Sequence, residues 1–145
     1  GWRIGYVAAP AFLTKAMNRL QSHATSNPCS ISQKAALAAL TSPQTCVTEM
    51  VGTFEKRRNY ILERLTHIPG LKTMKPSGAF YVFPNISAYH LSSSELCARL
   101  LDEAYVAVIP GAPFGRDDYI RISYSASMES LVKGMDAMEK FFQKL

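Results

Sequence analysis

The sequence predicts an α+β fold in which a small mixed sheet is covered by helices. Stretches with an apolar residue at every second position predict strands, and stretches with apolar residues three or four positions apart predict helices. Along the chain, one strand and several helices come first, and short strands with two further helices follow. The 145 residues are 48% hydrophobic and 19% charged, which is typical of a globular chain with a core.

The first third of the chain is predicted to be mainly helical. Residues 2–8 alternate in the manner of a strand, and Pro10 closes this segment. A short helical pattern covers residues 11–22, and the small polar residues 23–28 predict a loop. A helix of small residues, centred on Ala35, follows this loop.

A long helix is expected over residues 43–66. Ser42 is suited to cap this helix, and Pro43 is suited to its first turn, where no N–H bond is lost. The apolar stripe of the helix ends at residues 67–70, which read His-Ile-Pro-Gly. At about 1.5 Å per residue the helix is about 35 Å long, a length typical of helices that connect two domains.

The rest of the chain is predicted to form short strands and two helices. A helix is expected to begin at Ser93 or Ser94, and Ser127 is expected to cap the last helix. Apolar residues alternate with polar ones near the end of the chain, and Pro and Gly residues separate the segments. The strands are expected over residues 71–74, 79–83, 106–109 and 119–124.

Composition excludes several classes of protein. No run approaches the roughly 18 to 20 apolar residues of a membrane-spanning helix. The formal net charge is +5, but the densest basic group, residues 56–58 with Arg64, has glutamates beside it, which favours a solvated helix face over a nucleic-acid surface. The three cysteines have no C-x-x-C spacing, and the histidines have no metal-ligand spacing. We therefore expect no disulfide framework, no metal site, and a reducing, cytoplasmic compartment.

Two arginines are the candidate binding residues. Arg3 and Arg121 each lie within a predicted strand, on the face opposite its apolar side chains. Most strand arginines face solvent and have no particular role. A rigidly held planar guanidinium is, however, also suited to bind a carboxylate or a phosphate through two hydrogen bonds. The pattern alone leaves both interpretations open.

Several segments, in order and spacing, resemble class I aminotransferases of the aspartate aminotransferase type. The opening Gly-Trp-Arg-Ile-Gly-Tyr resembles the G-W-R-x-G-Y motif of that family, and the ordered set covers the chain almost end to end. The nearest likeness is to bacterial-type aspartate aminotransferases, including relatives that act on prephenate. The other matching segments are residues 21–28, 32–36, 76–81, 108–111 and 121–125.

The resemblance implies a role for five residues. Arg3 would bind the phosphate of pyridoxal 5′-phosphate (PLP), and Arg121 would bind the α-carboxylate of the substrate. Thr25, Ser26 and Asn27 would lie at the interface of a homodimer, near the cofactor of the neighbouring subunit. These three residues also fit an ordinary polar loop, and that alternative stays open. Both arginines are expected to face one common hollow.

The resemblance also implies parts outside this sequence. In the family, the lysine that forms the Schiff base with PLP stands before G-W-R at a position that falls upstream of Gly1, and none of the eight lysines here stands in that motif. We therefore expect no catalytic residue in this chain, a separate N-terminal large domain, and no activity of the chain alone. Residues 1–29 would trail from that large domain, 30–66 would form a helical connection, and 67–145 would form a small C-terminal domain.

The function that the resemblance implies is transfer of an amino group between an amino acid and a 2-oxo acid through PLP. Aspartate or glutamate is the expected substrate, and aromatic amino acids or prephenate come next. One alternative keeps the fold and changes the reaction to that of a PLP-dependent lyase or synthase. The other is a non-catalytic module that binds acidic partners through its basic charge, although no basic stripe interleaved with aromatic residues supports it.

Overall fold

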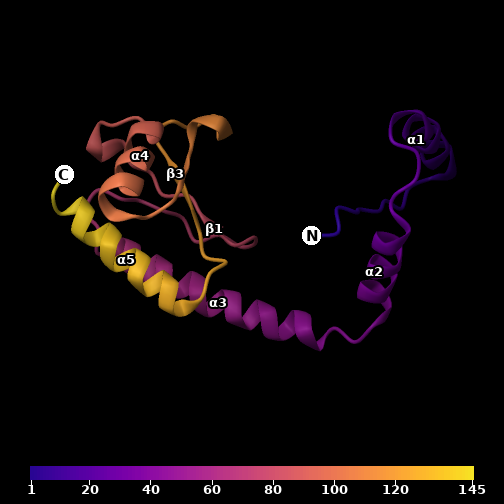
Figure 1. Cartoon of the computed structure of the whole chain (residues 1–145), viewed down its shortest axis with the longest axis horizontal. Coiled ribbons are helices and arrows are strands. Elements are labelled where there is room, and N and C mark those ends of the chain that lie inside the picture. The colour runs from indigo at the N-terminus through magenta and orange to yellow at the C-terminus, as the bar shows by residue number, and fades with distance from the viewer. The chain divides into compact units, whose positions relative to one another are not determined.

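The structure, a computed structural model, describes all residues from 1 to 145, which form two compact units, Gly1–Cys46 and Val47–Leu145. Unit 1 contains α1 (Ala11–Ala24) and α2 (Ser30–Thr41), and unit 2 contains nearly all of α3 (Thr45–Thr66) together with the sheet and the remaining helices (Figure 1). The expected domain boundaries after residues 29 and 66 stay a prediction.

The segment before α1 is irregular, so the predicted strand over residues 2–8 is wrong. Alternation of apolar and polar residues gives a segment the two faces of a strand, but a strand also requires a neighbouring strand with which its backbone forms hydrogen bonds. No backbone hydrogen bond joins residues 1–9 to any other segment. A side-chain contact holds the segment instead, because the Ser32 hydroxyl of α2 donates to the Trp2 carbonyl at 2.9 Å.

Both predicted helices of unit 1 are present, but they bury almost nothing. No residue of α1 is buried, and Ser32 is the only buried residue of α2. All buried hydrophobic residues of the chain belong to unit 2. Because apolar burial is what offsets the entropy cost of folding, unit 1 has little to stabilise it by itself.

The long helix α3 begins at Thr45, two residues later than predicted, and Ser42 does not cap it. The Ser42 N–H donates to the Ala38 carbonyl, and its extended backbone ends α2 instead. The predicted end of α3 is confirmed at Thr66. The two fully buried residues of the helix, Ile61 and Leu65, lie in its C-terminal half, and Phe54 packs against the core from the other half.

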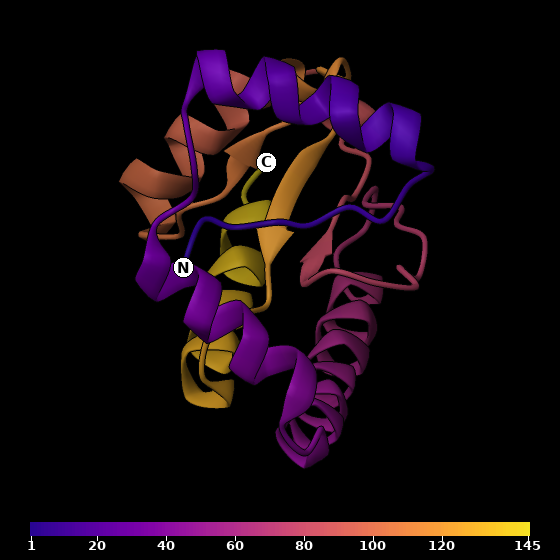
Figure 2. The same cartoon turned by 90° about the vertical axis from the view of Figure 1, so that its right-hand side faces the viewer.

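A three-stranded sheet with the order β1-β3-β2 lies in unit 2 (Figure 2). Its strands are β1 (Tyr81–Val82), β2 (Ile109–Pro110) and β3 (Ile120–Ser123). Both strand pairs are antiparallel. The sheet is therefore not the expected mixed sheet, because a mixed sheet would also contain a parallel pair. The strand expected over residues 71–74 is reduced to a single bridge between Lys72 and Asn85. The α+β class itself is confirmed.

The core of unit 2 lies between one face of the sheet and its helices. Ile120 and Ile122 of β3 are buried, whereas Arg121 and Ser123 lie on the opposite face, as the alternation predicts. Helix α4 (Ser93–Ala104) buries Leu96 and Leu100. Helix α5 (Met128–Phe142) contributes Leu131, Met135, Met138, Phe141 and Phe142.

The caps of these two helices follow from the sequence. The Ser92 hydroxyl accepts from the Glu95 N–H at the start of α4, and the Ser127 hydroxyl accepts from the Ser130 N–H at the start of α5. The predicted beginnings of both helices are therefore confirmed. None of the helices combines the length and hydropathy that crossing a bilayer requires.

Candidate functional site

Arg121 lies on the outer face of β3, where two aromatic rings pack against its guanidinium. The guanidinium carbon lies 4.4 Å from the centre of the Tyr81 ring and 4.6 Å from that of the Phe114 ring. Tyr81 belongs to β1, and Phe114 ends the short 3-10 helix η2 (Ala112–Phe114), which follows β2. Because β1 and β2 flank β3, the two rings approach Arg121 from the two sides of its strand.

The guanidinium of Arg121 has no anionic partner in the chain. Its Nε is buried and makes no hydrogen bond, and no ion pair of the structure includes it. A buried N–H without an acceptor is costly, so its place in a stable fold needs an explanation. An external acceptor group would remove this cost.

Antiparallel register explains why Tyr81 meets Arg121. Tyr81 pairs directly with Ser123, and Ser123 and Arg121 share one face of β3. Tyr81 and Arg121 are therefore diagonal neighbours on that face, close enough for an aromatic ring to reach a long side chain.

A tight loop fixes the position of Phe114. The Phe114 N–H donates to the Gly111 carbonyl at 2.8 Å, and the Gly111 N–H donates to the Tyr119 carbonyl at 2.9 Å. Ser93 is fully buried, and its hydroxyl accepts from the Ala112 N–H while donating to Asp117 at 2.6 Å. These bonds tie η2 to the start of α4, so the ring beside Arg121 sits on a rigid support.

Arg3 lies in unit 1 and has a different setting. It is exposed, it makes no hydrogen bond or ion pair, and its φ of 52° lies in the left-handed region, which non-glycine residues rarely adopt. Two hollows of about 430 and 720 Å³ border it, one against α2 and the other against α1 and Pro28. Its guanidinium is therefore open to an external anion.

The loop that contains Thr25, Ser26 and Asn27 closes α1. The N–H groups of Thr25 and Ser26 both donate to the Gln21 carbonyl, and the Asn27 side chain donates to the Pro28 carbonyl at 3.1 Å. Ser26 and Asn27 line a hollow that shares Gln21 and Pro28 with one of the hollows beside Arg3. The structure thus brings Arg3 and this loop into one neighbourhood of unit 1.

Arg3 and Arg121 belong to different units, and their shared hollow stays a prediction. The two aromatic partners of Arg121 were not among the residues predicted from the sequence. A signal for Tyr81 exists, since pairing residues 79–83 with 119–124 in antiparallel register places an aromatic residue diagonal to Arg121. Phe114 carries no such signal because it lies in a loop.

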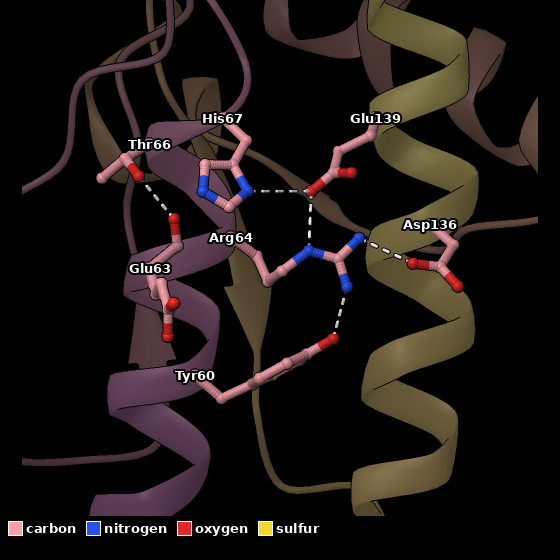
Figure 3. Close-up of polar contacts among 7 residues, drawn as sticks. All are labelled: Tyr60, Glu63, Arg64, Thr66, His67, Asp136 and Glu139. Carbon is pink, nitrogen blue, oxygen red and sulfur yellow. Dashed lines mark hydrogen bonds and ion pairs between the residues drawn. The ribbon is translucent and has the colours of Figure 1, made fainter.

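A second arginine cluster in unit 2 is structural. Arg64 of α3 donates from Nε to Glu139 at 2.7 Å, from Nη2 to Asp136 at 2.6 Å, and from Nη1 to the Tyr60 hydroxyl, as Figure 3 shows. These bonds link α3 to α5. They also lower the pKa of Glu139, chiefly through the hydrogen bond from Arg64. Each guanidinium nitrogen of Arg64 has an acceptor within the chain, unlike the Nε of Arg121. No group of acidic, histidine or cysteine side chains is arranged to hold a metal ion.

Comparisons with known proteins agree on one family. The profile described as aminotransferase class I and II matches residues 1–136. The aspartate aminotransferase of Geobacillus stearothermophilus is 45% identical over 99% of this chain and 38% of its own length. The crystal structure of the aspartate aminotransferase from Rhizobium meliloti superposes with a TM-score of 0.91 at 38% identity, covering 99% of this chain and 38% of that one. The aromatic aminotransferase of Pyrococcus horikoshii gives a TM-score of 0.90 at 38% identity, covering 99% and 39%.

The fold is therefore that of the aminotransferases whose crystal structures superpose on it. More particularly, the chain belongs to the aminotransferase class I and II family. It spans a little over a third of the length of the curated relatives it matches. Aminotransferases of this class in general depend on PLP.

Proposed function

We propose that this chain is the C-terminal part of a PLP-dependent aminotransferase, which moves an amino group between an amino acid and a 2-oxo acid. The observation that carries the proposal is the unpartnered guanidinium of Arg121, with its buried Nε and no carboxylate of its own. Arg121 would bind the α-carboxylate that amino-acid and oxo-acid substrates share, through two charge-assisted hydrogen bonds.

The residues present fit the cofactor that the family implies. Arg3 is exposed beside two hollows and has no anion within the chain, so it is available to the phosphate of PLP. When bound, PLP supplies an electron sink for the carbon that loses or gains the amino group. The lysine that holds the cofactor would come from sequence outside this chain, and the chain alone would be inactive.

The proposed assembly is a homodimer. Thr25, Ser26 and Asn27 would lie near the cofactor of the neighbouring subunit, and their polar groups are exposed and suited to contact it. The proposed substrate is aspartate or glutamate, because relatives of this chain are named aspartate aminotransferase and one is named a glutamate/aspartate-prephenate aminotransferase. An aromatic amino acid is the second choice, because an aromatic aminotransferase has nearly the same fold.

A chimaeric enzyme tests this proposal. This chain would replace the corresponding residues of the Geobacillus stearothermophilus aspartate aminotransferase, and amino transfer from aspartate to 2-oxoglutarate would be measured. Arg121→Ala is expected to lower kcat/KM by about 30- to 1,000-fold, equivalent to about 2–4 kcal/mol. Arg121→Lys is expected to restore only part of this, because an ammonium cannot replace the planar fork.

Arg99→Ala is a suitable control, since Arg99 is partly exposed and pairs with Glu103 within α4. An Arg121→Ala chimaera that binds PLP and retains full kcat/KM would refute the role of Arg121. Release of ammonia and a 2-oxo acid without amino transfer would instead identify a lyase.

A further inference from the structure

Arg121 is set apart from the other arginines that contact aromatic rings. Arg57, Arg64, Arg99 and Arg116 each lie over one ring, whereas Arg121 lies over two, and these two make no stacking contact with each other. Aromatic rings attract a cation through the negative potential of their faces, and the attraction grows as water is removed. The two rings therefore limit the movement and the hydration of this guanidinium.

Arg116, in the same unit, is an example of a guanidinium that stacks on an aromatic ring and binds a carboxylate at the same time. It lies 4.3 Å from the ring centre of Tyr119, and its Nε and Nη2 each donate to one oxygen of Asp118 at 2.9 Å. The ring covers a face of the guanidinium and leaves its edge free for a two-bond contact. Arg121 has a comparable stacking distance and lacks the carboxylate.

We propose that Tyr81 and Phe114 form an aromatic clamp that orients Arg121, making them positioning residues of the substrate site. The inference rests on the proposed function and extends it to two residues that do not themselves bind the carboxylate. With rings packed against the guanidinium from both sides of β3, acceptor groups reach it along its edge. A planar carboxylate fits that approach because both of its oxygens lie in one plane with the N–H donors.

The backbone contacts that fix the positions of Tyr81 and Phe114 agree with a positioning role for their rings. Tyr81 is fixed by a strand ladder, and Phe114 by the loop that Gly111 and Ser93 hold. Phe114 remains 50% exposed, more than a ring needed only for core packing would be. Both rings lie on the face of the sheet opposite the buried Ile120 and Ile122, so they add little to the core.

Nuclear magnetic resonance of the 145-residue chain tests the clamp without any enzyme assay. The Nε–Hε signal of Arg121 would be assigned through its loss in Arg121→Lys and followed during titration with propanoate at constant ionic strength. We expect an upfield ring-current shift of this signal in the free chain and a saturable shift with propanoate. Tyr81→Leu and Phe114→Leu should each reduce the ring-current shift and weaken propanoate binding by about 3- to 10-fold.

Tyr81→Phe is the conservative variant, because it keeps the ring, and it should bind propanoate like the unmodified chain. Tyr105→Leu and Phe12→Leu are matched controls, since Tyr105 is 89% exposed, Phe12 is 71% exposed, and neither contacts Arg121. Unchanged propanoate binding in both Tyr81→Leu and Phe114→Leu would overturn the clamp and leave the proposed function intact. Absence of any propanoate response at Arg121 in the unmodified chain would instead count against the proposed carboxylate site itself, and the clamp would fall with it.

Discussion

Replacing Arg64 by Met should weaken the connection between α3 and α5 and lower the stability of unit 2. Met has a similar length and keeps much of the apolar contact, but it lacks the guanidinium and therefore the three hydrogen bonds that Arg64 donates. The carboxylate of Glu139, whose side chain is 23% exposed, would lose its ion pair with Arg64. The half-exposed Asp136 would also lose its ion pair with Arg64, which is the weaker of the two. The Tyr60 hydroxyl would also lose its donor.

The size of the effect follows from the exposure of each partner. A charge-assisted hydrogen bond to a mostly buried group contributes about 1.5–3 kcal/mol, which applies to Glu139. A pair with an exposed partner contributes about 0.2–1 kcal/mol, which applies to Asp136. We therefore expect a loss of about 2–4 kcal/mol in the free energy of unfolding. With a urea dependence of about 2 kcal/mol per molar, the midpoint should fall by about 1–2 M.

Urea denaturation followed by the near-ultraviolet circular dichroism of tyrosine measures this change. Six of the seven tyrosines lie in unit 2, whereas the single tryptophan, Trp2, lies in unit 1 and reports on that unit separately. Lys133→Met is the matched control, because Lys133 pairs with Glu129 inside α5 and both side chains are about three-quarters exposed. It should cost about 0.5 kcal/mol or less. Equal midpoints for the two variants would show that the Arg64 cluster does not hold the helices together.

The same variant should change the response of unit 2 to acid. The hydrogen bond from Arg64 lowers the pKa of Glu139 in the folded state. Its contribution to stability is therefore fully present above the unfolded-state pKa of about 4.3 and is lost as the pH falls through the folded-state pKa. The stability difference between the unmodified chain and Arg64→Met should thus shrink below about pH 4. A difference that stays constant down to pH 2 would contradict this account.

Two further predictions concern packing and thiol reactivity. In Gly111→Ala, the new Cβ would lie 2.2 Å from a loop carbonyl oxygen, so unit 2 should lose about 2 kcal/mol or more in urea denaturation. Gly134→Ala in α5 meets nothing within 4 Å and should gain about 0.5–1 kcal/mol; the reverse order would refute the packing argument. Hydrogen bonds from backbone N–H groups of α2 lower the pKa of Cys29, and burial raises that of Cys97 to about 11. Iodoacetamide at pH 8 should therefore alkylate Cys29 well before Cys97, as peptide mass spectrometry would show, and prior labelling of Cys97 would contradict this.

The parts of the fold that the sequence predicted well are those with local causes. Helix α5 combines a Ser127 cap with an apolar stripe, and both features act within a few residues, so its beginning and its buried face were predictable. The alternation of β3 likewise gave the correct face for Arg121. In each case the pattern itself contains the physical cause of the structure.

The features that the sequence did not reveal depend on distant partners. The alternation over residues 2–8 predicts a strand, but the backbone of that segment has no neighbour to pair with. The contact between Tyr81 and Arg121 joins residues 40 positions apart and exists only because β1 pairs with β3 in one register. A one-residue shift of that register would turn the Tyr81 ring to the other face of the sheet.

Arg3 and Arg121 therefore differ in how many of the contacts that would orient them come from this chain. Arg121 stands on a central strand over a core of its own unit, and that unit also supplies both rings that orient it. Arg3 stands on an irregular segment of a unit without an apolar core, in a strained backbone conformation beside a single side-chain hydrogen bond, from Ser32 to the Trp2 carbonyl. Carboxylate binding at Arg121 should consequently be measurable in the 145-residue chain, whereas phosphate binding at Arg3 should require packing partners that unit 1 does not provide by itself. Strong binding of inorganic phosphate at Arg3 in this chain, with none of propanoate at Arg121, would reverse that order and contradict the argument from burial.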